Sequence, residues 1–208
     1  MKRITAILMG IGISLAFAGC TSQSLEGQQE QVNFFGMDTY MTITAYGEDA
    51  GEAVEEAQAR ILKLEKEWSV TDESSQIYQA NHSGESPVTL SDDTRDVVSF
   101  ALEMAEKTGG ALEPTIYPVL EAWGFTTDEN RIPAPDEIQT LLVHVGYEQV
   151  SLSGNELTLP EGVELDLGAV GKGYAGDAAA EVIKEQGVTS ALLDLGGNIQ
   201  AVGKRPDG

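Results

Sequence analysis

Cysteine and basic residues are scarce in this sequence of 208 residues. It contains one cysteine, two histidines and 12 lysines and arginines, against 34 aspartates and glutamates. A single cysteine excludes an internal disulfide and a zinc cluster built on several thiolates. The formal net charge of −22 repels polyanions, so we expect no nucleic-acid partner. Any phosphate-bearing ligand must be held by a local site or through a metal.

The first twenty residues have the pattern of an export signal that ends in a lipidated cysteine. Lys2 and Arg3 precede an apolar run from Ile4 to Ala18, which is short for a membrane span and has the length of a secretory h-region. Small residues precede Cys20, as lipoprotein signal peptidase requires, although Phe17 stands where Leu is usual. An ordinary N-terminal anchor or a buried cysteine is the alternative.

This pattern divides the chain into three parts. We predict a lipoprotein signal peptide over residues 1–19, a flexible polar tether over 20–31 that begins at a lipid-anchored Cys20, and one folded domain over 32–208. Such a protein lies on the extracytoplasmic face of a cell membrane, which is the periplasmic side of an inner membrane.

Helical and extended patterns alternate irregularly through the domain, which predicts the α+β class. Apolar residues recur every three or four positions in the segments that we expect to be helices, and Thr, Ile and Val dominate the expected strands. The expected helices are 48–67, 92–108 between a Ser91 cap and Gly109-Gly110, a short one between Pro135 and Gly146, and 173–186. The expected strands are 40–46, 147–152, 156–159, 163–167, 191–195 and 198–202, with a hairpin turn at 153–155.

The run DLGAVGKGYAGD at residues 166–177 predicts a phosphate site where a strand leads into a helix. Gly168, Gly171 and Gly173 let the backbone approach a ligand, and the free amides of a first helical turn attract phosphate. Lys172 adds a full positive charge. Asp166 can accept a ribose or ring hydrogen bond or orient a metal-bound water.

Two other interpretations of this run remain open. Residues 171–176 satisfy G-x-G-x-x-G, and Asp194 ends the next expected strand, as in a nicotinamide-binding Rossmann unit. Against that reading, Glu164 and Asp166 interrupt a strand that a parallel sheet would bury. The other alternative is a glycine-rich helix start with no ligand. A P-loop is excluded because Asp166 stands five positions before Gly171, where that pattern requires its first glycine.

Four segments carry a family resemblance. They are FGMDTY at 35–40, SVTDESSQIYQAN at 69–81, GGALEPTIYPVLEAWGF at 109–125, and DLGAVGKGYAGDAAAEVIKEQG at 166–187 followed by ALLDLGGNIQAVGK at 191–204. Together they resemble the ApbE family of FAD:protein FMN transferases, which implies an ApbE-like, T-fold-like flavin transferase domain. Two positions depart from the family pattern: Thr71 stands where an aromatic residue stacks on the ligand, and Glu113 replaces the usual Asp.

The resemblance implies a set of ligand contacts. FAD would be bound by Met37, Thr71, Ala111, Leu112, Glu113, Asp166 and Lys172, and the carbonyl of Ala169 would bind Mg²⁺. Trp68 or Tyr78 could supply the ring that is missing at Thr71. Family enzymes cleave the FAD pyrophosphate, pass the FMN phosphoryl group to a threonine hydroxyl of an extracytoplasmic flavoprotein of the respiratory-complex type, and release AMP.

The resemblance also implies segments that this sequence does not contain. The family continues through H-x-(I/V)-D-P-x-x-G and A-D-x-x-x-T, whose Asp and Thr complete the magnesium site, and His82 and His144 are not placed to replace the missing His. We therefore expect a domain that is incomplete at its C-terminus, with weak FAD binding and little or no transfer. The alternatives are a non-catalytic FAD-binding lipoprotein and an NAD-dependent oxidoreductase.

Overall fold

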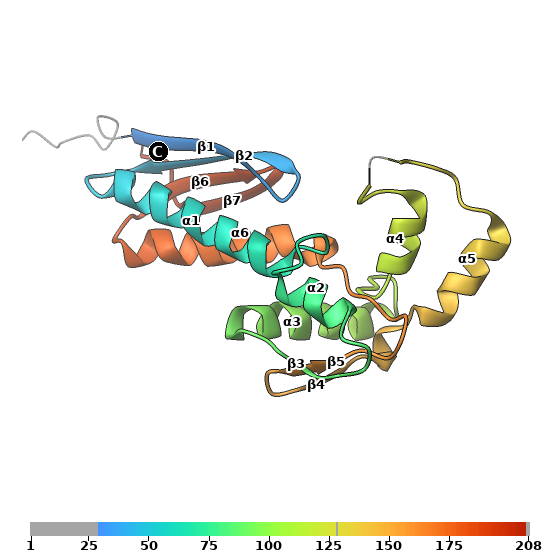
Figure 1. Ribbon diagram of the computed structural model, residues 1–208. Helices are drawn as coiled ribbons and strands as arrows, with labels where there is room; N and C mark the ends of the chain where they lie inside the picture. The colour runs from blue at the N-terminus through green and yellow to red at the C-terminus, as the bar shows by residue number, and fades with distance from the viewer. Residues whose placement is uncertain (1–28, 128, 207–208) are drawn as a thin grey trace, which may run out of the picture.

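The computed structural model describes residues 29–127 and 129–206. Its main sheet is antiparallel, with the strand order β1-β2-β6-β7. The strands are β1 (Gln29–Gly36), β2 (Thr39–Tyr46), β6 (Ser190–Leu195) and β7 (Asn198–Gly203). Along β2, Met41, Ile43 and Ala45 are buried and alternate with partly exposed residues. One face of the sheet therefore forms the core, and α1 and α6 cover it (Figure 1).

Helices α1 (Ala50–Trp68) and α6 (Gly168–Glu185) lie side by side on the sheet. In α1, Ile61 and Leu64 are fully buried on the expected stripe. The facing side of α6 is built from small residues, among them Ala175 and Ala179, which let the two helices pack closely. The C-terminal end of α1 and the N-terminal end of α6 lie together at one end of the sheet (Figure 1). The site described below lies at these two helix ends.

A second layer of shorter elements follows the C-terminal end of α1 (Figure 1). It contains the helices α2 (Gln76–Asn81), α3 (Asp92–Thr108), α4 (Tyr117–Trp123) and α5 (Pro135–Leu141), the 3₁₀ turns Leu142–His144 and Tyr147–Gln149, and a small sheet of β3 (Val88–Thr89), β5 (Glu156–Thr158) and β4 (Ser151–Ser153). In α3 the Ser91 side chain accepts a hydrogen bond from the Thr94 amide, and Gly109 closes the helix at φ 62°. Both ends of α3 were predictable from these caps.

The structure confirms the α+β class and corrects three of the expected elements. The segment 163–167 is not a strand, because its pairing is limited to an isolated bridge between Ile116 and Glu164. Helix α6 begins at Gly168, five residues before the expected Gly173. The glycines at its start are compatible with helix once the first turn packs into the core, which residue propensity does not reveal. The expected hairpin at 153–155 is confirmed, but residues 147–149 form a 3₁₀ turn.

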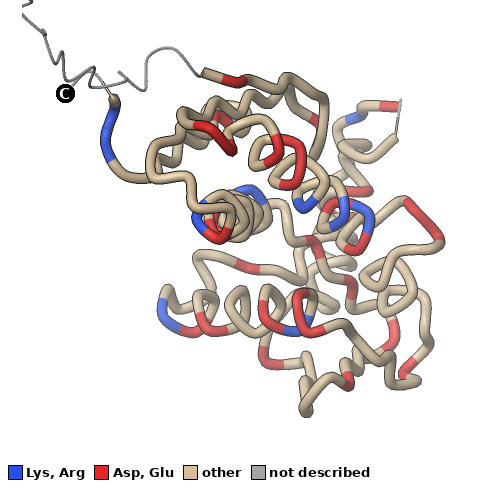
Figure 2. The backbone as a smooth tube through the Cα atoms, turned by 90° about the vertical axis from the view of Figure 1, so that its left-hand side faces the viewer, with Lys and Arg blue, Asp and Glu red and all other residues tan. Residues whose placement is uncertain are grey.

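Strand β1 begins at Gln29, so residues 29–31, the last residues of the segment expected to be a tether, belong to the main sheet. The predicted signal peptide and the lipidated Cys20 lie outside the described residues. Within residues 29–127 and 129–206, no helix is long and apolar enough to cross a membrane. Acidic positions occur along the whole drawn chain rather than on one face (Figure 2).

Candidate functional site

A cavity of about 660 Å³ opens where the two layers meet. Five segments line it: the β1–β2 turn, the end of α1, the loop after α1, the loop after α4, and the start of α6. The lining residues are Met37, Asp38, Glu65, Trp68, Ser69, Val70, Thr71, Phe125, Thr126, Thr127, Asp166, Leu167, Gly168, Gly171 and Lys172. This volume is typical of a cavity that holds a cofactor-sized molecule.

The start of α6 supplies the charged groups of this cavity. The Gly168 amide donates to Oδ1 of Asp166 over 2.9 Å. Burial raises the pKa of Asp166 above its usual range, while the Gly168 amide and the charge of Lys172 act in the opposite direction. The Val170 and Gly171 amides both donate to the Leu167 carbonyl, at 3.0 and 2.7 Å, so the amides at this helix start are largely paired within the chain. Lys172, one turn further on, brings a positive charge to the same wall.

The β1–β2 turn forms the opposite wall in a strained conformation. Met37 and Asp38 both have left-handed backbones, with φ values of 48° and 57°. Hairpin turns of this kind favour Gly and Asn, and other residues cost about 1 kcal/mol each. The Met37 amide donates to Oε1 of Glu65 on α1 over 2.6 Å, which holds the turn in place. Strain at a cavity wall is a recurring feature of ligand sites.

Two aromatic side chains contribute to the wall in different ways. Trp68 is 6% exposed and packs edge-on against Tyr174, with ring centroids 5.7 Å apart. It therefore supports the wall from within the core. Phe125 is 67% exposed and reaches the cavity from the loop after α4. Its ring stacks on that of Trp123, with centroids 6.4 Å apart, and most of its surface stays exposed.

Of the two rings expected to replace the one missing at position 71, Trp68 lines the cavity and Tyr78 does not. Thr71 lines the cavity with a hydroxyl group, within 3.2 Å of the Ser69 hydroxyl. Tyr78, one of the two candidates for the missing ring, stacks on His82 at 4.0 Å and is not among the lining residues. Phe125 was visible in the sequence only as part of the W-G-F motif, which gave no indication of its position.

The structure brings together four of the residues that the sequence indicated as ligand contacts. Met37, Thr71, Asp166 and Lys172 all line the cavity, although they come from three distant segments. Ala169 is exposed in the first turn of α6, next to the lining residue Gly168.

Ala111, Leu112 and Glu113 do not line the cavity. The Glu113 carboxylate accepts hydrogen bonds from the amide and hydroxyl of Thr115, at 3.0 and 2.7 Å, and from the Tyr147 amide at 3.1 Å. Glu113 therefore joins two chain segments in this structure.

The Rossmann interpretation of residues 171–176 is wrong. Gly171, Gly173 and Gly176 lie inside α6 and not in a turn before a helix. The main sheet is antiparallel, so it has no parallel strand edge at which a dinucleotide could bind. Two of these glycines have packing roles: Gly171 lies against the ring of Trp68, and a Cβ at Gly176 would meet the Gln200 side chain at 2.6 Å.

Comparison with known proteins identifies the family. The model of the ApbE family matches residues 37–208. The chain belongs to the ApbE family. Its sequence is 31% identical over 160 residues to the FAD:protein FMN transferase of Treponema pallidum (strain Nichols), covering 73% of this chain and 44% of that protein. It is 25% identical over 225 residues to the FAD:protein FMN transferase of Haemophilus influenzae, covering all of this chain and 63% of that protein.

A solved ApbE structure has the same fold. The crystal structure of the ApbE protein from Thermotoga maritima matches with a TM-score of 0.82 at 27% identity, over 86% of this chain and 60% of that one. The chain thus spans less than two thirds of the length of each of these ApbE proteins.

The start of α6 offers oxygen ligands of the kind that Mg²⁺ takes. The Asp166 carboxylate lines the cavity, and Ala169 follows three residues later with its backbone carbonyl. Within the described ranges, no three His, Cys, Asp or Glu side chains converge to hold a metal by themselves. Magnesium commonly binds one or two carboxylates and keeps water and substrate phosphates as its other ligands. Asp166 and Ala169 supply one carboxylate and one carbonyl oxygen, which is a partial set of donors for such an ion.

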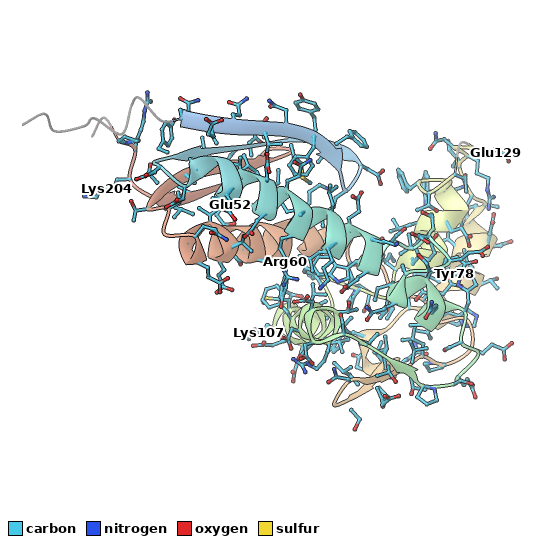
Figure 3. The ribbon with its side chains drawn as sticks, turned by 60° about the vertical axis from the view of Figure 1, so that its left-hand side comes forward. Glu52, Arg60, Tyr78, Lys107, Glu129 and Lys204 are labelled. Atoms are coloured by element: carbon cyan, nitrogen blue, oxygen red, sulfur yellow. The ribbon has the colours of Figure 1, made fainter. Side chains whose placement is uncertain are left out.

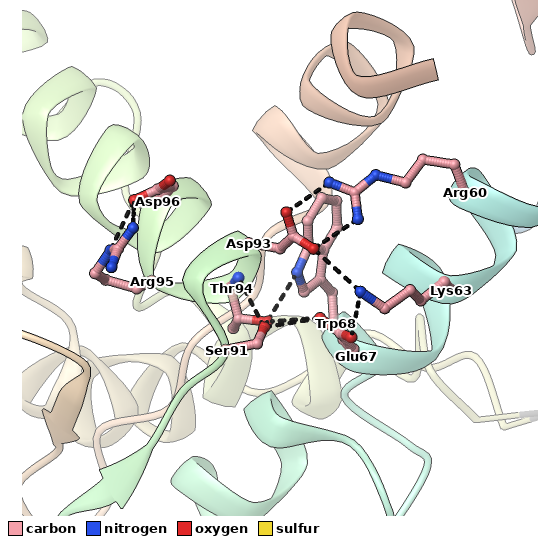
Figure 4. Close-up of polar contacts among 9 residues, drawn as sticks. All are labelled: Arg60, Lys63, Glu67, Trp68, Ser91, Asp93, Thr94, Arg95 and Asp96. Carbon is pink, nitrogen blue, oxygen red and sulfur yellow. Dashed lines mark hydrogen bonds and ion pairs between the residues drawn. The ribbon is translucent and has the colours of Figure 1, made fainter. Parts of the chain in front are cut away.

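A polar network behind Trp68 joins α1 to α3 (Figure 4). The Trp68 indole donates to the Thr94 hydroxyl over 3.2 Å, and the hydroxyl groups of Ser91 and Thr94 both donate to Glu67. Beside this cluster, Arg60 extends from α1 toward α3 (Figure 3) and forms two hydrogen bonds with the Asp93 carboxylate. The network fixes the end of α1, and with it the cavity wall that follows.

Acid is expected to lower the free energy of unfolding of this ApbE chain, because the Asp93 carboxylate becomes protonated. The hydrogen bonds from Arg60 hold the pKa of Asp93 at about 2, below its ordinary 3.8. A lowered folded-state pKa contributes stability that is present above pH 4 and is lost as the pH falls toward 2. The pKa difference corresponds to at most ~2.5 kcal/mol, and solvent screening of this partly exposed pair reduces it to ~1 kcal/mol.

Urea denaturation between pH 5 and pH 2.5, for the wild type and Asp93→Asn, measures this contribution. The variant should lose less stability across that range. Parallel curves for the two proteins would show that Asp93 contributes nothing to the acid sensitivity.

Proposed function

We propose that this chain forms the flavin-binding part of an FAD:protein FMN transferase. The observation that carries the proposal is the cavity at the start of α6, which is lined by Asp166 and Lys172 together with Phe125 and the Met37 turn. FAD combines a diphosphate with two planar ring systems. A cationic helix start next to an exposed aromatic ring matches both of these features.

The proposed reaction transfers the FMN moiety to a threonine side chain of an extracytoplasmic flavoprotein. The threonine oxygen forms a bond to the phosphorus of the FMN half, the P–O bond to the AMP half breaks, and the hydroxyl proton is released. Lys172 and the positive end of the α6 dipole would orient the pyrophosphate and balance its charge, which is the main contribution of a protein to phosphoryl transfer. Mg²⁺ at Asp166 and Ala169 would neutralise further charge on the pyrophosphate.

The proposed location follows from the first twenty residues. Export and acylation of Cys20 would hold the domain on the extracytoplasmic face of the membrane, where its acceptor flavoprotein is exposed. The polar residues that follow Cys20 would separate the folded domain from the lipid surface.

An acceptor-labelling experiment tests the function. The polypeptide, translated to its natural stop codon, is mixed with FAD, Mg²⁺ and a flavoprotein domain that contains a threonine acceptor. Covalent FMN makes the acceptor fluorescent in a denaturing gel, and AMP should appear in equal amount. Acceptor Thr→Ala serves as the matched control. FAD binding without labelling of any acceptor would favour the non-catalytic flavin-binding lipoprotein, and failure to bind FAD would remove both proposals.

A further inference from the structure

The segment that carries Asp166 into the cavity is extended but belongs to no sheet. Val163, Leu165 and Leu167 are buried, whereas Glu164 and Asp166 are partly exposed, so the side chains alternate as in a strand. One backbone edge is paired, because the Asp166 amide donates to the Pro114 carbonyl over 2.8 Å next to the Ile116–Glu164 bridge. That pairing restrains only one side of the segment.

The other edge is paired with a side chain. In an extended chain, the amide and carbonyl of one residue point to the same edge, and those of the next residue point to the opposite edge. The Leu165 amide donates to Oδ1 of Asn81 over 2.8 Å, and Nδ2 of Asn81 donates to the Leu165 carbonyl over 2.9 Å. The Asn81 amide therefore replaces a neighbouring strand at the residue just before Asp166, across 84 positions of sequence.

Asn81 is itself firmly placed. It is the last residue of α2, which is held in the core by Ile77 and Ala80 (Figure 3 marks this helix at Tyr78). The helix is capped by Ser75, whose hydroxyl accepts from the Tyr78 amide over 2.9 Å and donates to the Ser69 carbonyl. Ser69 also begins the loop that lines the cavity. The same short helix thus connects the 69–71 wall to the backbone that precedes Asp166.

We propose that Asn81 is a positioning residue of the flavin site. By bonding both polar groups of Leu165, it sets the position of the Asp166 carboxylate and of the first turn of α6 relative to the 69–71 wall. This role rests on the proposed function, because it assigns Asn81 to the binding of the FAD pyrophosphate. Asn81 does not line the main cavity, so it acts through Asp166 and not by touching the ligand.

FAD titration of Asn81→Ala tests the role. We expect the Kd for FAD, in the presence of Mg²⁺, to rise about tenfold, which corresponds to ~1.4 kcal/mol. Amide exchange should become faster at Leu165 and the residues that follow it. The matched control is Asn155→Ala, since Nδ2 of Asn155 also bonds a backbone carbonyl, that of Leu90, but does so away from the cavity. The control should keep the wild-type Kd within about twofold even if its melting temperature falls.

Asn81→Asp separates positioning from general stability. A protonated Asp has one donor and one acceptor, which are the two groups that the bonds to Leu165 need, whereas an ionised Asp would present a charge to the Leu165 carbonyl. The Kd ratio of this variant to the wild type should therefore fall as the pH is lowered from 8 toward the pKa of the introduced carboxyl, while the ratio for Asn81→Ala stays high throughout. Position 81 is half-buried, and the Leu165 carbonyl that faces the new side chain disfavours its ionised form.

The possible outcomes separate this inference from the proposed function. Wild-type affinity in Asn81→Ala, or a ratio for Asn81→Asp that does not change with pH, would overturn the positioning role while FAD binding by the wild type stands. A wild-type chain that binds no FAD would overturn the proposed function, and the role of Asn81 with it.

Discussion

Lys172→Met is expected to weaken FAD binding by about 10- to 100-fold. Among the described residues that line the cavity, Lys172 is the basic one, while Asp38, Glu65 and Asp166 are acidic. Without it, the pyrophosphate would meet a wall of negative charge in a protein that already carries a formal charge of −22. A charge-assisted hydrogen bond in a sheltered site contributes about 1.5–3 kcal/mol, which gives this range.

Flavin fluorescence titration at low and moderate salt measures the loss. Lys184→Met is the matched control, because Lys184 lies exposed in the last turn of the same helix. It removes an equal charge at a distance from the cavity. Equal affinities for the two variants would show that overall charge, and not a contact at the start of α6, determines binding.

Trp68→Ala should cost about 3–5 kcal/mol of unfolding free energy, a large part of the ~5–15 kcal/mol that a domain of this size has. The indole is buried, packs on Tyr174, lies against Gly171 and donates to Thr94. Removing it opens a void between α1 and α6 beside the cavity. Trp68→Phe keeps most of the ring contacts and removes the indole hydrogen bond to the Thr94 hydroxyl, which keeps its hydrogen bond with Ser91, so we expect a cost of about 1–2 kcal/mol.

Urea unfolding followed by circular dichroism gives these free energies. Trp123→Ala is the control, because Trp123 is 37% exposed and should contribute far less. A similar loss in Trp68→Ala and Trp123→Ala would contradict the view that Trp68 joins α1, α3 and α6. Loss of FAD binding in Trp68→Phe at unchanged stability would instead assign the indole N–H a direct role at the ligand.

Several parts of the fold were predictable because they depend on neighbours in the sequence. The helix stripe that ends at Trp68 follows from contacts three and four positions apart. The ends of α3 follow from Ser91 and Gly109, whose preferences are local. The β6–β7 hairpin follows from Gly196-Gly197 between two apolar runs.

The predictions for residues 163–167 and for the start of α6 were wrong because these segments depend on contacts with distant parts of the chain. The alternating residues 163–167 have the pattern of a strand, but the partner of Leu165 is the Asn81 side chain and not a strand. The glycines after Asp166 disfavour helix by intrinsic propensity, yet α6 starts at Gly168 because Leu167 and Val170 are buried there. Local propensity cannot register either of these tertiary contacts.

The sequence by itself determined the α+β class, the main helices and the glycine-rich run that marks the charged wall of the cavity, because periodicity, capping and motif spacing are local properties. Only the tertiary structure decided that Phe125 reaches the cavity, that Glu113 bonds Thr115 and Tyr147, and that Asn81 pairs with Leu165. These contacts join residues far apart in the chain. Their partners depend on how the layers pack, and no local pattern specifies that packing.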